Sequence, residues 1–81
     1  MTEAVQIMTS YLNSENIFIS AAEATSTLAK WATKFPDLDA LSIVALAISD
    51  PQEIAITPNE IREIRNFYFP PKNLIERSNY F

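Results

Sequence analysis

The sequence predicts an all-α protein, a compact bundle of four to five helices in a single domain that spans residues 1–81. The chain contains no glycine, and glycine is the preferred residue in the tight turns of β-hairpins. Five prolines divide the chain into segments, and proline interrupts helices. Within these segments apolar residues recur every three or four positions, which is the period of an α-helix.

The first two expected helices cover residues 2–13 and the segment from Ser20 to about Phe35. Residues 2–13 place Val5, Met8, Tyr11 and Leu12 on one stripe, with Ile7 beside it. In the second segment Ser20 and Glu23 have the spacing of a capping box, in which side chain and backbone groups at a helix start bond reciprocally. Its apolar stripe consists of Ala24, Leu28, Trp31 and Phe35. We expect Trp31 to lie in the core.

The third and fourth expected helices cover residues 38–48 and 57–68. Residues 38–48 are apolar around nearly the whole circumference, which is typical of a buried central helix; we expect Asp37 and Asp39 in its first turn. Thr57 and Glu60 form a second capping box around Pro58. Ile61, Ile64 and Tyr68 form the inner face of the fourth helix. Residues 70–81 follow as a C-terminal tail, or contribute a short fifth helix at 72–79.

The composition excludes several kinds of chemistry. Cysteine and histidine are absent, which removes disulfides, the usual zinc sites and the common nucleophile arrangements of hydrolases. Without glycine there is no phosphate-binding loop. We therefore expect no enzymatic activity, no cofactor and no metal. No segment has the length of a membrane span and no secretory signal is evident, so the expected location is cytoplasmic, without membrane contact.

One short pattern occurs twice. Residues 16–23 (NIFISAAE) and 53–60 (EIAITPNE) both read Ile-x-Ile, then Ser or Thr, then two residues, then Glu. Each copy leaves one expected helix and enters another. The chain thus contains two helix–loop–helix units, whose segments Ile17–Ile19 and Ile54–Ile56 can pair as a short antiparallel bridge.

This arrangement resembles the paired EF-hand family. The resemblance rests on Ile19 and Ile56 at the eighth loop position and on Glu23 and Glu60 at the end of each loop. Calcium needs several oxygen ligands early in the loop and a glycine at its sixth position. The sixth positions here hold isoleucines, and Leu12, where the first loop would start, has no ligand oxygen. The resemblance therefore implies a degenerate pair that binds no calcium.

Charge and aromatic residues are unevenly distributed. Residues 1–60 carry a net charge of −6, from two lysines and eight acids, and residues 61–81 carry +2, from four bases and two acids. Phe67, Tyr68 and Phe69 span about 200° of a helix, so one bundle face cannot bury all three. Aromatic residues and arginine are enriched at interface centres. The sequence thus predicts a protein interaction module, an adaptor or regulator that docks a protein partner or forms a homo-oligomer. The expected contact residues are Arg62, Arg65, Phe67, Phe69, Tyr80 and Phe81.

Two alternatives remain open at the level of sequence. One is a small acidic inhibitor or immunity-type protein that blocks a basic site of a target enzyme. Its acidic surface would consist of Asp37, Asp39, Asp50, Glu53 and Glu60. The other is a helix-turn-helix-like DNA-binding regulator that reads DNA with the helix carrying Arg62. The net charge of −4 and the connection of about eight residues before that helix argue against nucleic acid as a partner.

Overall fold

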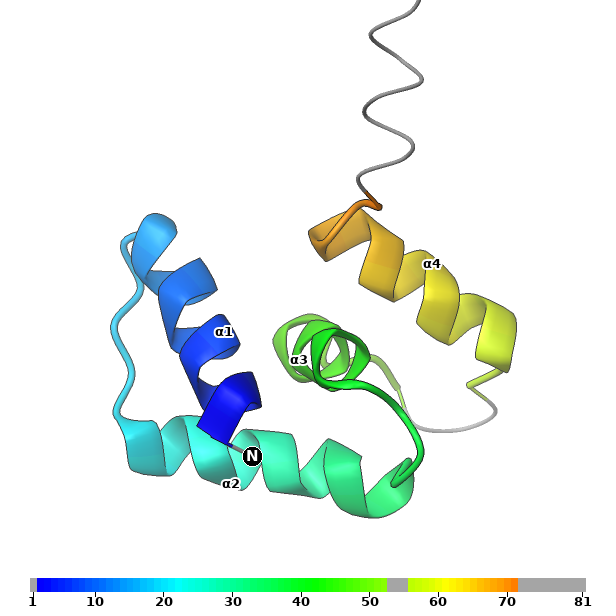
Figure 1. Cartoon of the computed structure of the whole chain (residues 1–81), viewed down its shortest axis with the longest axis horizontal. Coiled ribbons are helices and arrows are strands. Elements are labelled where there is room, and N and C mark those ends of the chain that lie inside the picture. The colour runs from blue at the N-terminus through cyan, green and yellow to red at the C-terminus, as the bar shows by residue number, and fades with distance from the viewer. Residues whose placement is uncertain (1, 53–55, 72–81) are drawn as a thin grey trace, which may run out of the picture.

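The computed structural model describes residues 2–52 and 56–71, and they form four helices (Figure 1). These are α1 (Thr2–Ser14), α2 (Ala21–Lys34), α3 (Ala40–Ser49) and α4 (Pro58–Tyr68). No strand occurs within the described residues, so the all-α prediction is confirmed. The candidate fifth helix at 72–79 lies outside the described residues.

Helix α3 is the centre of the bundle, as its sequence predicts. Residues 43–47 are all buried, and α3 packs against each of the other three helices. Figure 1 shows α3 nearly end-on, with α1, α2 and α4 arranged around it. A helix that is apolar around nearly its whole circumference is stable in water only when neighbouring helices cover it on several sides.

Trp31 lies in the core, as expected. Its side chain is fully buried, together with Leu28, Val44 and Leu46. The indole ring stacks on Phe35 at a centroid distance of 6.3 Å, and the Lys30 ammonium lies 5.2 Å from the ring centroid. The indole Nε1 is buried and has no hydrogen-bond acceptor within the described part of the chain. Such an unsatisfied buried donor is unusual in a folded protein.

Side-chain caps define the helix starts. The Ser20 hydroxyl accepts from the backbone N–H of Glu23 at 3.1 Å. At Thr57 the capping box is complete, because the Glu60 N–H donates to the threonine hydroxyl and the Thr57 N–H donates to the Glu60 carboxylate. Both starts lie where the sequence predicts them.

The start of α3 differs from the prediction. Asp37 and Asp39 do not lie in its first turn, since the helix begins at Ala40. Asp39 is instead the N-cap residue, and its carboxylate accepts from the Ser42 N–H at 3.3 Å. The short aspartate side chain satisfies an otherwise unpaired backbone donor from this position. Asp37 lies in the preceding turn.

Two of the described residues adopt a left-handed backbone conformation. Asn16 has φ of 62° after α1, and Asp50 has φ of 47° at the end of α3. Glycine usually takes such positions, and Asn and Asp are the residues that tolerate them best otherwise. The Asp50 N–H closes α3 by donating to the Leu46 carbonyl, and its carboxylate lies 3.5 Å from the Lys30 ammonium.

The two connections that carry the repeated pattern are well separated. In Figure 1 the α1–α2 connection lies on one side of the molecule, and the described residues of the α3–α4 connection, 50–52 and 56–57, lie on the other. The segment Ile17–Ile19 is expected to pair with Ile54–Ile56, and two residues of the second segment, 54 and 55, lie outside the described residues. The EF-hand-like pairing stays a prediction.

Candidate functional site

A groove runs along one side of α4. Its volume is about 800 Å³, and it lies between α4 and the segment that joins α2 to α3. Its lining residues come from four parts of the chain: Phe35, Leu38, Asp39, Ser42, Ile56, Pro58, Ile61, Arg62, Arg65, Asn66 and Pro71. The lining residues on α4 run from Pro58 to Asn66, so this wall is about 12 Å long at 1.5 Å per residue.

The α4 wall follows directly from helix geometry. Pro58, Ile61, Arg62, Arg65 and Asn66 all line the groove, and their spacing of three and four places them on one helix face. Ile61 is buried against the core, whereas Arg62 is exposed. The wall thus changes from apolar at its base to polar at its rim.

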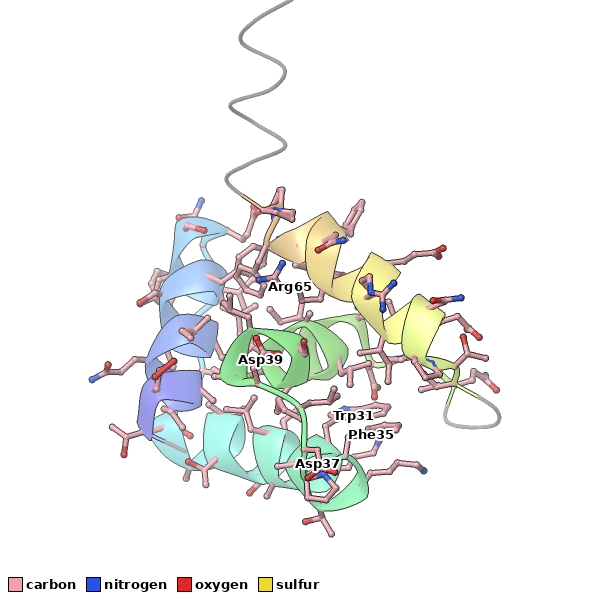
Figure 2. The ribbon with its side chains drawn as sticks, turned by 45° about the vertical axis from the view of Figure 1, so that its right-hand side comes forward. Trp31, Phe35, Asp37, Asp39 and Arg65 are labelled. Atoms are coloured by element: carbon pink, nitrogen blue, oxygen red, sulfur yellow. The ribbon has the colours of Figure 1, made fainter. Side chains whose placement is uncertain are left out.

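The opposite wall comes from the end of α2 and the start of α3. Phe35 and Leu38 are half-buried and pack against the core, and Asp39 and Ser42 lie beyond them along the chain. Figure 2 shows Asp39 at the start of α3 and Arg65 on α4, so the carboxylate and the guanidinium belong to different walls. The floor is apolar and the two rims differ in charge.

Both arginines of the groove lie on α4 without a carboxylate partner among the described residues. No acidic side chain in residues 2–52 or 56–71 lies within ion-pair distance of Arg62 or Arg65. Arg65 is half-buried and donates through Nη1 to the Asn66 amide oxygen at 3.1 Å. The Asp39 carboxylate is engaged with the Ser42 N–H. The α4 rim therefore presents two positive charges that the described chain leaves uncompensated.

An aromatic cluster marks the C-terminal end of α4. Tyr68 and Phe69 each contact the Tyr11 ring edge-on, at centroid distances of 5.7 Å. Phe67 touches Tyr68 but remains 77% exposed. As expected from their angular spread, the three consecutive aromatics do not all enter the core. Phe69 serves partly as a fold contact, which the sequence does not reveal.

Four of the six contact residues that the sequence predicts lie within the described residues. Arg62, Arg65, Phe67 and Phe69 lie along α4 or directly after it. Tyr80 and Phe81 lie outside the described residues.

The acidic residues of the alternative surface are not gathered in one place. Asp39 and Asp50 cap the two ends of α3, about 15 Å apart for ten residues. Glu60 belongs to the capping box of α4, Asp37 is exposed before α3, and Glu53 lies outside the described residues. Three of these carboxylates thus have a local structural role.

The sequence does not predict that two apolar residues between the first two helices are exposed. Ile17 is 49% and Phe18 76% exposed, in the α1–α2 connection. Neither residue belongs to the apolar stripe of α1 or α2, because both lie between these helices. This position is the signal from which their exposure could be predicted. Neither of them lines the groove.

The comparisons with known proteins leave the site to be judged on its geometry. No protein-family model matches the chain, and no curated protein or solved structure shows a match either. Within residues 2–52 and 56–71 there is no group of three acidic, histidine or cysteine side chains placed to hold a metal ion. None of the described helices combines the length and the apolar character needed to cross a membrane.

Proposed function

We propose that this chain is a non-enzymatic helical interaction module that docks a protein partner, or a second copy of itself, through α4. The contact residues are Arg62, Arg65, Phe67 and Phe69, joined by Tyr80 and Phe81. The observation that carries the proposal is the groove along α4. Its rim has two arginines without a carboxylate partner among the described residues, and a 77% exposed phenylalanine lies at the end of the same helix.

The composition of this surface favours a protein partner. Protein interfaces combine an apolar centre with aromatic and arginine side chains that contribute most of the binding energy. The groove supplies the apolar centre through Phe35, Leu38 and Ile61. Helix-in-groove binding requires this kind of elongated apolar depression.

The alternatives receive less support from the described residues. A basic target would need a concentrated acidic surface, and the described acids are dispersed. Asp39 caps α3 and Glu60 belongs to the capping box of α4, whereas the Asp50 carboxylate lies beside Lys30. DNA binding would rest on two arginines beside an apolar depression, whereas phosphate contacts usually need a wider basic surface. Paired EF-hand units would bring their two loops together, and the described parts of those loops are on opposite sides in Figure 1.

The test compares two phenylalanines with nearly equal exposure. Phe67 is 77% and Phe18 76% exposed, and they lie at different places on the molecule. The baits are the wild-type chain and the variants Phe67→Ala and Phe18→Ala. Mass spectrometry quantifies the proteins that each bait captures, and light scattering measures its self-association. We expect at least one interaction that Phe67→Ala weakens about tenfold and Phe18→Ala leaves unchanged.

Circular dichroism of both variants controls for folding, since neither side chain is buried. The proposal is overturned if neither captured proteins nor self-association depend on Phe67 while the variants remain folded. An interaction lost only with Phe18→Ala would place the contact surface at the α1–α2 connection instead.

A further inference from the structure

We infer that the partner presents an amphipathic helix to the α4 groove, with apolar side chains in the groove and a carboxylate against Arg62 and Arg65. This inference rests on the proposed function and specifies the chemistry of the partner. It comes from three features of the groove: its length, its apolar floor, and the difference in charge between its two walls.

The dimensions of the groove suit a helical segment. The α4 residues that line the groove run from Pro58 to Asn66, a length of about 12 Å, which corresponds to about two turns of a docked helix. Apolar side chains on such a helix recur every three or four residues and enter a groove from one face. Phe35, Leu38, Ile56 and Ile61 supply the apolar surface that these side chains would cover.

The charge of the α4 rim specifies the polar group of the partner. A docked helix would remove water from Arg65, which is already half-buried, and from the neighbouring Arg62. Removing water from a charge without supplying a partner is costly. A carboxylate satisfies a guanidinium through two parallel hydrogen bonds, and the geometry of arginine favours this pairing. A glutamate or aspartate beside the apolar face of the partner therefore fits.

The other wall specifies on which side that acid lies. Asp39 lies on the α3 wall, and a partner carboxylate beside it would be repelled. The acid must then be directed toward α4, with neutral or basic residues toward α3. Such an arrangement fixes the orientation of the bound helix, since complementary charges determine register and exclude wrong partners.

A second copy of the chain does not offer this chemistry within the described residues. The apolar stripes of its helices are directed into its own core, through residues such as Met8, Leu28 and Ile61. Nucleic acid would match the arginines but would leave the apolar floor without a function. A separate acidic, amphipathic helix matches both features.

The test is a selection from a displayed library of helical peptides. Their apolar positions vary among Leu, Ile, Phe and Trp, and the flanking positions vary among Glu, Gln, Lys and Ser. Selection on the full chain should enrich Glu on one flank of the apolar face. We expect the leading peptide to bind about tenfold more tightly than its Glu→Gln counterpart in a fluorescence anisotropy titration, and this advantage should shrink at high salt.

Variants of the chain assign that advantage to the groove. Arg62→Gln, at an exposed position, should abolish most of the preference for Glu, whereas Lys34→Gln removes one positive charge from α2 and should leave it unchanged. Arg65→Lys is the second variant, because it retains the charge while losing the bidentate geometry. Amide chemical shifts on peptide addition should change at Ser42, Ile61 and Asn66 and remain unchanged at Phe18.

Each contrary outcome is informative. Equal enrichment of Glu and Gln, no enriched peptide, or shift changes away from the groove overturns the inference about partner chemistry. Concentration-dependent shifts of the groove amides without peptide would make a second copy the occupant, and displacement of the peptide by duplex DNA would favour nucleic acid. All of these leave the Phe67→Ala and Phe18→Ala comparison as an independent test of the proposed function.

Discussion

Replacing Trp31 by phenylalanine should alter the free energy of unfolding very little, although Trp31 has the largest fully buried side chain among the described residues. Two effects oppose each other. The substitution removes two carbon atoms of apolar contact, a loss of about 1.6 kcal/mol at about 0.8 kcal/mol per buried carbon group. It also removes the buried indole N–H, which has no acceptor among the described residues and costs about 1–3 kcal/mol while unsatisfied. The expected net change is within about 1 kcal/mol of zero.

Two further substitutions calibrate this expectation. Trp31→Ala leaves a large cavity and should destabilise the fold by about 3–5 kcal/mol, a large part of the total for a small domain. Leu28→Ala, at an equally buried position without a polar atom, should cost about 2–5 kcal/mol. Both losses exceed the change expected for phenylalanine.

Urea denaturation monitored by far-ultraviolet circular dichroism measures all three variants, since the chain has one tryptophan and its fluorescence is lost with it. The dependence of the free energy on urea should stay constant if the native and unfolded states keep their compactness. A loss of more than about 3 kcal/mol for Trp31→Phe would refute the reasoning, because it would mean that the indole N–H makes a favourable bond.

Three other substitutions test the surface and the helix ends. Phe67→Ala should change stability by less than about 0.5 kcal/mol, whereas Phe69→Ala loses ring contacts with α1 and should cost about 1–2 kcal/mol; paired thermal melts separate them, and equal losses would contradict the placement of the two rings. Thr57→Ala should cost about 1 kcal/mol through loss of the capping box, and an unchanged urea midpoint would show that the cap contributes nothing. Asp50→Gly should be neutral or stabilising by up to about 1 kcal/mol, because Asp50 has a positive φ that glycine adopts without strain; a clear loss would indicate that its ion pair with Lys30 outweighs the strain.

Most of the helical architecture follows from local rules that act within a few residues. The Thr57 capping box, the apolar circumference of α3 and the stripe through Trp31 are visible in the sequence and occur in the structure. The start of α3 is predicted less well. Aspartate near a helix start can act in the first turn or as a cap, and only the backbone geometry shows that Asp39 is the cap.

The candidate site depends on contacts that the sequence does not encode locally. The period of α4 predicts that Arg62 is exposed, and the angular spread of its aromatic residues predicts that at least one stays outside the core. The groove itself requires Phe35 and Leu38 to lie opposite α4, which is a property of how three helices pack. The contact of Phe69 with Tyr11 joins residues at distant positions in the chain and is likewise set by tertiary packing.

The attachment of α4 has a consequence for local unfolding. Among the described helices α4 has backbone neighbours only in α3, and it reaches α1 through the rings of Tyr11, Tyr68 and Phe69. Helix α4 can therefore detach while α1, α2 and α3 stay packed, and its amide hydrogens should exchange with solvent faster than those of α3.

Because α4 forms one wall of the groove, the binding of a ligand in the groove and the packing of α4 on α3 are thermodynamically linked. Consider a ligand that binds only when α4 is packed on α3. Once its concentration exceeds its dissociation constant, it raises the free energy of α4 detachment in proportion to the logarithm of the ratio of these two quantities. Slower hydrogen exchange in α4 would then report occupancy of the groove even where the folded structure does not change.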